Sequence, residues 1–235
     1  TQASFRKYLE QRKPKVLILS TPCTGTKGFS ALNRAINHDA WLRSRRVSVP
    51  LGKPAASAEL CQMLAGRHVL AVHPRSADPW KLPMWKHIGA DTQVVKVLVH
   101  PCIAGLRGPR RGLPIKKPTE FWAPNPALVA YIRKFKCDGR HVHSQLDARE
   151  PGAGADKAKD AARWPMGLCQ GLAKGCEDVL RKQHREQGSA TYVVADPVSW
   201  EKAKIATLPA LTHAISFIFV SQTGAAMYTL SLIHI

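Results

Sequence analysis

The sequence predicts an α/β fold, a parallel-rich sheet with helices on its faces, and two observations lead to it. Short uninterrupted apolar runs at 16–19, 68–72 and 94–99 are typical of strands buried on both faces. Segments whose apolar residues recur at helical spacing lie between and after these runs, and such alternation favours a parallel sheet. With 235 residues, 45% hydrophobic and 22% charged, the chain can bury a sizeable core, which excludes wholesale disorder.

The first half of the chain supplies three strands and a helix. The strand at 16–19 runs into the turn-rich segment 20–25, at the carboxyl end where open α/β sheets gather ligands. Residues 55–65 are expected to form a helix, because their apolar residues have helical spacing and Gly66 can form the C-terminal cap. The second and third apolar runs supply the next two strands.

The second half begins with a loop at 105–118, which is rich in Gly, Pro and Arg, followed by a strand at 119–123. Asn125 is a suitable N-cap, with Pro126 at the first position of the helix that follows. One face of that helix is apolar and consists of Leu128, Val129, Ile132 and Phe135.

A flexible connection is expected at 150–156, and a last amphipathic helix starts near Pro165 and ends at Gly188. Its apolar stripe consists of Leu168, Leu172, Cys176 and Leu180. We therefore expect one α/β domain over 1–188 and an uncertain tail over 189–235 that does not belong to it. The chain begins with Thr1 rather than Met, so we expect it to be a piece of a longer protein.

Charge indicates the kind of partner. Lys and Arg number 35 against 16 Asp and Glu, a formal net charge of +19. Such a field attracts polyanions, of which DNA or RNA is the commonest, although a merely solvated basic surface is the alternative. The candidate nucleic-acid-binding residues lie in one basic stretch and are Arg107, Arg110, Arg111, Lys116, Lys117 and Thr119.

Cysteine and histidine suggest a metal site. Cys137, His141 and His143 are closely spaced, and these residue types suit tetrahedral zinc, with Cys102 and Cys169 as candidates to lie nearby. Two solvent-facing histidines in a basic loop are the alternative interpretation.

The cellular location is expected to be the cytoplasm or the nucleus. The six cysteines are irregularly spaced and follow no signal peptide, which favours reduced thiols. Residues 205–235 contain no Asp, Glu, Lys or Arg and are long enough to span a bilayer, but Pro209, Gln222 and many hydroxyl residues argue against a membrane anchor. We expect no membrane partner.

Cys23 is the candidate nucleophile. It follows a buried strand and a proline, and Lys27 nearby would favour its thiolate; an inert cysteine in a turn is the alternative. Around it, the chain resembles DNA cytosine-5 methyltransferases, more closely the divergent phage and mobile-element members. The resembling segments cover about 13–182 in the family's order: the Pro22–Cys23 loop, 68–74, 76–85, 102–106, 116–122, 137–143 and 164–169.

The resemblance implies a Rossmann-like methyltransferase domain that uses S-adenosylmethionine, with Ser20, Thr21 and Pro22 beside that cofactor. It implies that Cys23 attacks C6 of a cytosine extruded from the stack. In the family, a glutamate holds the N3 edge of the cytosine and stabilises the charge that develops.

Two departures bear on activity. Val72 stands where the family has that glutamate, and His73 should point to the opposite face of the strand. The family's F-x-G-x-G cofactor loop has no counterpart in residues 1–15. We therefore expect a fragment or degenerate copy of a methyltransferase domain, inactive as it stands; the alternative is a non-catalytic, zinc-stabilised nucleic-acid-binding module of a mobile-element polyprotein.

Overall fold

The computed structural model describes residues 2–21, 34–108, 112–144, 163–186, 215–220 and 227–230. Their helices and strands are α1 (Gln2–Arg12), β1 (Val16–Ser20), α3 (His38–Leu64), β2 (His68–Pro74), the 3₁₀ helix η1 (Asp78–Lys81), α4 (Pro83–Ala90), β3 (Val95–Val99), β4 (Thr119–Ala123), the 3₁₀ helix η2 (Pro126–Val129), α6 (Met166–Glu186), β5 (Ile215–Val220) and β6 (Met227–Leu230). The expected α/β class is confirmed.

The strands form one mixed sheet in the order β3-β4-β2-β1-β5-β6. Among β1 to β4 only β1 and β2 pair in parallel, whereas β4 is antiparallel to both β2 and β3. The expectation of a parallel-rich sheet is therefore corrected for these four strands. The physical reason is the connection from β3 to β4. Its described residues, 100–108 and 112–118, include no crossover helix, and the chain returns in the opposite direction.

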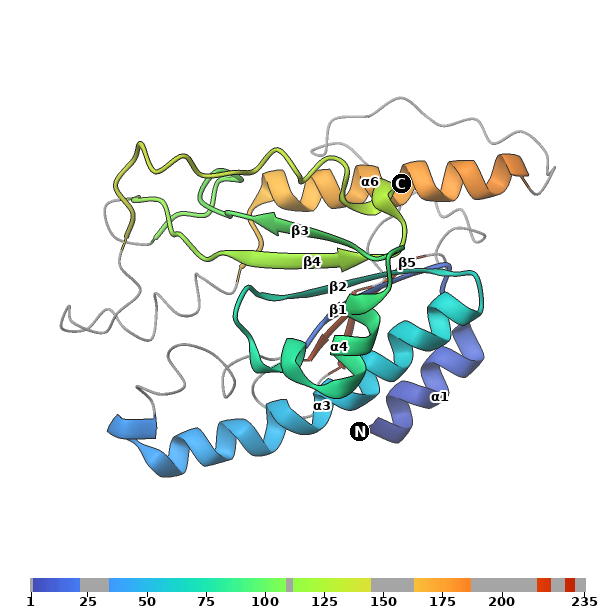
Figure 1. Ribbon diagram of the computed structural model, residues 1–235, viewed down its shortest axis with the longest axis horizontal. Coiled ribbons are helices and arrows are strands. Elements are labelled where there is room, and N and C mark those ends of the chain that lie inside the picture. The colour runs from blue at the N-terminus through green and yellow to red at the C-terminus, as the bar shows by residue number, and fades with distance from the viewer. Residues whose placement is uncertain are drawn as a thin grey trace.

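Helices cover both faces of the sheet (Figure 1). On one face α6 and η2 pack on apolar side chains that include Ile18, Leu70 and Phe121. On the other face α1, α3 and α4 pack on alternate residues of the same strands, such as Leu17 and Ala71. Since successive side chains of a strand point to opposite faces, one apolar run fills both layers of core.

Most of the expected elements are present, with one extension. The helix expected at 55–65 is the C-terminal part of α3, which begins at His38 after the N-cap Asn37. The side-chain oxygen of Asn37 accepts a hydrogen bond from the backbone N–H of Ala40 at 2.9 Å. Gly66 follows the helix with a φ of 63°, a left-handed conformation that glycine adopts without strain.

In the second half, Asn125 caps the 3₁₀ helix η2 rather than an α-helix, and the four apolar residues expected on one face are all buried. The last helix is confirmed as α6. Residues 150–156 and Gly188 lie outside the described part of the chain. Of the expected tail, β5 pairs in parallel with β1, and β6 pairs with β5. In the ranges that the structure describes, no helix has both the length and the apolar character needed to cross a bilayer.

Candidate metal centre and basic edge of the sheet

One edge of the sheet brings together the ends of four strands. The register places Thr119, at the start of β4, opposite both Pro74 at the end of β2 and Val99 at the end of β3. Because β1 runs parallel to β2, its carboxyl end at Ser20 lies at the same edge. The segments that follow β1, β2 and β3 and the loop that precedes β4 therefore all leave the sheet here.

A cluster of four metal-ligating side chains lies beyond the end of β3. The ligand atoms of Cys102, Cys137, His141 and His143 all lie within 4.8 Å of one another. The Sγ of Cys137 is 3.3 Å from Nε2 of His143 and 3.8 Å from Nε2 of His141. Ligands bound at 2.0–2.3 Å to a tetrahedral zinc lie roughly 3.3–3.8 Å apart, and the two distances from the Cys137 sulfur fall in this range.

The local fold that assembles the cluster depends on His100. Its backbone N–H donates to the carbonyl of Phe135 at 2.8 Å, and its Nδ1 accepts the backbone N–H of Cys137 at 2.9 Å. These two bonds hold the segment 135–137 against the end of β3, two residues before Cys102. Gly139, with a φ of 80°, then turns the chain so that the two histidines approach the Cys137 thiol.

The surroundings of the cluster shift the pKa of two of its donors, Cys102 and His143. Burial, and then a hydrogen bond that the Cys102 thiol donates to Cys137, raises the pKa of Cys102 to about 11 in the metal-free chain. Burial, His141 and Lys116 lower the pKa of His143, which favours the neutral imidazole that a metal requires. Burial, and then the charges of Lys116, Lys136, Arg75 and His143, also lower the pKa of His100.

The structure thus brings together the three metal ligands expected from the sequence and adds Cys102 as a fourth. Cys169 is not among them, since its thiol donates to the carbonyl of Trp164. The five described cysteines are free thiols, as expected: Cys61, Cys102, Cys137, Cys169 and Cys176.

The expected catalytic segment is described only in part. Cys23 and Pro22 lie outside the described residues, as do Arg110 and Arg111 of the basic stretch. Ser20 is half-buried at the end of β1. The hydroxyl of Thr21 lies 3.0 Å from Nε2 of His73, which links the ends of β1 and β2.

The remaining residues of the basic stretch differ in exposure. Arg107 and Lys116 are exposed and Lys117 is half-buried. Thr119 is buried, and its hydroxyl donates to the carbonyl of Lys117 at 2.8 Å.

Val72 and His73 point to opposite faces of β2, as the alternation of a strand requires. Val72 belongs to the core under α6, whereas His73 packs edge-on against Trp80 and Trp85 on the other face. Burial lowers the pKa of His73 to about 3, and its Nδ1 has no hydrogen-bond partner. His73 is therefore a neutral core residue and does not replace a glutamate at position 72.

Sequence reasoning missed one buried ionisable group, Glu59 on α3. Its side chain is fully buried, neither carboxyl oxygen has a hydrogen-bond partner, and burial raises its pKa to about 8. The helical spacing of the sequence could have indicated this burial. Glu59 follows Ala55 by four residues and precedes Gln62 by three, so the three share one face of the helix, and all three are buried.

Comparison with known proteins adds no relative: no family model, no curated protein and no solved structure matches this chain.

Proposed function

We propose that this chain is a partial or degenerate cytosine-5-methyltransferase-like domain that binds nucleic acid, with a zinc ion pinning the loops at the binding edge. The observation that carries the proposal is the convergence of Cys102, Cys137, His141 and His143 at the edge of the sheet that also carries the basic loop. The nucleic acid is DNA, or else RNA, and the proposed setting is a mobile-element protein.

The arrangement of strands supports a Rossmann-like, methyltransferase-type sheet. β1, β2 and β3 run in one direction, and β4 is inserted in the reverse direction between β2 and β3. Many doubly wound folds carry an antiparallel edge strand on an otherwise parallel sheet. Here β4 is reversed next to one edge strand, and β6 is reversed at the other edge. The ligand edge of such a sheet is the carboxyl edge of its parallel strands, where the Thr21–His73 contact lies.

The packing of Val72 in the core supports nucleic-acid binding rather than catalysis as the proposed function. Val72 is packed under α6, so β2 supplies no carboxyl at the position of the family's glutamate. Without a group that stabilises the charge developing on the attacked cytosine, a thiol at position 23 would accelerate the reaction little. The proposed role of the chain as it stands is therefore to hold nucleic acid.

Zinc is the metal that the donor set favours. The cluster offers two thiols and two imidazoles within 4.8 Å of one another. Two cysteines and two histidines are a common ligand set of structural zinc sites, in which the protein fills all four positions. A metal held in this way cross-links the end of β3 to the segment 137–143.

Metal content tests the zinc proposal directly. Native mass spectrometry of the full chain, purified without chelator, should give one zinc per chain. The matched variants are Cys102→Ser, which removes a ligand, and Cys169→Ser, which removes a thiol outside the cluster. Equal zinc content in the two variants would contradict the assignment.

Salt dependence tests nucleic-acid binding. Fluorescence anisotropy with a labelled duplex should give an affinity that falls linearly on a log–log plot against salt concentration, because phosphate contacts release counterions. An affinity that does not change with salt would count against a phosphate-binding surface.

Transfer of labelled methyl groups from S-adenosylmethionine to DNA should be absent. Transfer that is abolished by Cys23→Ala would instead establish an active enzyme and overturn the binding-only proposal.

A further inference from the structure

The basic loop between β3 and β4 is a small folded unit. The backbone N–H of Gly108 donates to the carbonyl of Leu113 at 2.9 Å, and that of Ile115 donates to the carbonyl of Leu106 at 3.0 Å. Beneath these bonds the side chains of Leu106 and Ile115 form a cluster of their own, separate from the main cores. The loop therefore has a defined shape over 106–108 and 112–115, with Arg107 exposed on it.

The loop is tied to the metal cluster at both ends. At its beginning, the backbone N–H of Leu106 donates to the carbonyl of Pro101, which directly precedes the ligand Cys102. At its end, the backbone N–H of Ser144 donates to the carbonyl of Pro114 at 2.8 Å, and Ser144 forms a parallel bridge with Ile115. Ser144 directly follows the ligand His143, so a metal that holds Cys102 and His143 also holds both ends of the loop.

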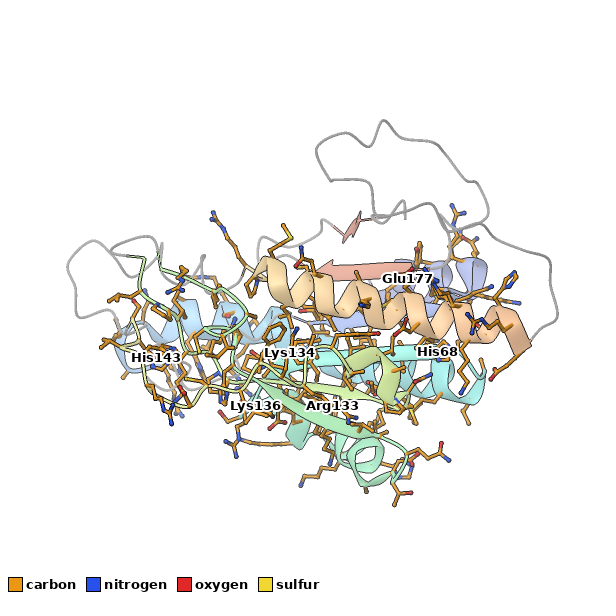
Figure 2. All side chains as sticks on the ribbon, turned by 90° about the horizontal axis from the view of Figure 1, so that it is seen from above. His68, Arg133, Lys134, Lys136, His143 and Glu177 are labelled. Carbon is orange, nitrogen blue, oxygen red and sulfur yellow. The ribbon has the colours of Figure 1, made fainter. Side chains whose placement is uncertain are left out.

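Cations gather where the loop rejoins the sheet. Lys116 and Lys136 are exposed, and the ammonium group of Lys136 donates to the carbonyl of Leu98 near the end of β3. The backbone N–H of Arg75 donates to the carbonyl of Pro118 at 2.9 Å, so Arg75 lies beside the segment that carries Lys116. Figure 2 shows His143 at one end of the molecule, opposite the C-terminal end of α6. The exposed Arg140 lies between Cys137 and the two histidine ligands in the sequence.

Acidic groups neutralise this surface only weakly. Glu120 lies 3.9 Å from Arg75, and Asp138 lies 3.5 Å from Arg140. Exposed pairs at such distances stabilise a fold very little, and a phosphate group can displace them. Lys116 and Lys136 add their charges to the same edge.

We infer that the surface formed by Arg75, Arg107, Lys116, Lys136 and Arg140 binds the phosphate backbone of nucleic acid, and that the metal held by Cys102, Cys137, His141 and His143 keeps this surface in its binding shape. This inference rests on the proposed function and adds its residues and its dependence on metal. Nucleic acid is the partner because its regular row of phosphates can engage several separated cations at once, which a single carboxylate or sulfate cannot do.

Metal removal is the first test. The full chain is titrated against a labelled 20-base-pair duplex before chelation, after chelation, and after one equivalent of zinc is restored. We expect affinity at least tenfold weaker after chelation and recovery on adding zinc. Equal affinity in all three samples would overturn the inference while leaving zinc binding and nucleic-acid binding intact.

Charge removal locates the surface. The double variant K116A/K136A should bind zinc normally and lose about tenfold in duplex affinity. Its salt slope should be smaller by about two, because each of the two lysines neutralises one phosphate. The matched control is K7A/K182A, which removes two exposed lysines from α1 and from the C-terminal end of α6. If the control loses as much affinity as the double variant, the surface is elsewhere.

A variant that spares every ligand and every cation tests the connection between them. Ile115→Ala opens a cavity under the loop, where Ile115 is fully buried. We expect this variant to keep its zinc and to lose several-fold in duplex affinity, whereas Leu64→Ala, at an exposed position, should change neither. Unchanged binding in Ile115→Ala would show that the shape of the loop does not matter.

The class of partner is tested with the zinc-loaded chain. Single-stranded RNA and single-stranded DNA of the same charge as the duplex should bind with the same dependence on Lys116 and Lys136. Polyglutamate of equal charge should bind at least tenfold more weakly, and tighter binding of polyglutamate would identify an acidic protein as the partner instead.

Discussion

The thiol of Cys137 lies 3.3 Å from Nε2 of His143, six residues along the chain, and the backbone N–H of Gly139 points at the same sulfur from 3.4 Å. A thiolate accepts such a hydrogen bond while it ligates a metal, and the glycine makes the turn possible. This local unit is readable from the sequence, whereas the fourth donor, Cys102, reaches it only through the fold. The proposed metal site therefore combines a local unit with a donor from a distant part of the sequence.

Cys102 is the proposed ligand that lies far from the other three in the sequence, and its removal should lower the thermal stability of the zinc-loaded chain. Cys102→Ser should lower the midpoint of thermal unfolding of the zinc-loaded chain by several degrees, because the metal no longer cross-links the end of β3. Cys169→Ser should leave the midpoint within about one degree, since surface changes have small effects. Differential scanning calorimetry with and without chelator measures both; a chelator effect that persists undiminished in Cys102→Ser would contradict the assignment.

Glu59 should make the fold less stable as the pH rises. The carboxyl of the unfolded chain releases its proton near 4.5, whereas burial keeps it protonated in the fold up to about 8. Its raised pKa therefore favours the fold below about 4.5, and that contribution is lost as the pH increases to about 8.

The substitution Glu59→Gln should remove this dependence. We expect the variant to be more stable than the natural chain at pH 8.5 by roughly 3–5 kcal/mol, at about 1.4 kcal/mol per pKa unit. Urea unfolding between pH 6.5 and 8.5 measures this difference in stability. The pKa of His73 is 6.5 in the unfolded chain and about 3 in the fold, so His73 does not affect the comparison in this pH range. Parallel stability curves for the two proteins over this range would show that the carboxyl is not buried.

Gly175 allows α6 to approach η2 closely. A Cβ built at this position would lie 2.6 Å from the carbonyl oxygen of Leu128 and 2.8 Å from that of Ala127. Gly175→Ala should therefore destabilise the fold by about 1–3 kcal/mol, although alanine is the better helix former. Chemical denaturation measures the loss, with the exposed Gln170→Ala as control; a Gly175→Ala variant at least as stable as the natural chain would show that α6 does not lie against η2.

The hydrogen bond between Thr21 and His73 should stabilise the carboxyl edge of the sheet. In Thr21→Val the buried imidazole would have no partner on either nitrogen, which costs about 1–3 kcal/mol. Thr21→Ser keeps the hydroxyl and should recover most of that loss. Unfolding free energies of the two variants test the contact, and equal values would mean that the hydroxyl does not reach the histidine.

The strands of this fold were predictable because their apolar runs are local. Val16–Leu19 and the run from His68 lie within strands that the structure has almost at the predicted bounds. The first half of α3 was missed because Pro50 and Pro54 lie inside the helix, where proline usually breaks one. The direction of β4 was missed because pairing between β2 and β4 depends on contacts about 50 residues apart, which no local pattern encodes.

The candidate metal site was likewise predictable only in the part that is local in the sequence. Cys137, His141 and His143 are near one another in the sequence, so their residue types and spacing indicated a metal. Cys102 joins them because His100 holds the segment 135–137, a contact that requires the folded end of β3. Helical spacing alone could have predicted that Glu59 is buried. It was missed because a charged residue beside an apolar stripe is usually assigned to the exposed edge of the helix.

X-ray absorption at the zinc edge of the purified full chain reports the atoms that surround the metal and so examines the proposed Cys102, Cys137, His141 and His143 site itself. We expect a four-coordinate zinc with two sulfur neighbours at about 2.3 Å and two nitrogen neighbours at about 2.0–2.1 Å, and one sulfur neighbour fewer in Cys102→Ser. A shell of oxygen atoms, or a spectrum that Cys102→Ser leaves unchanged, would contradict it.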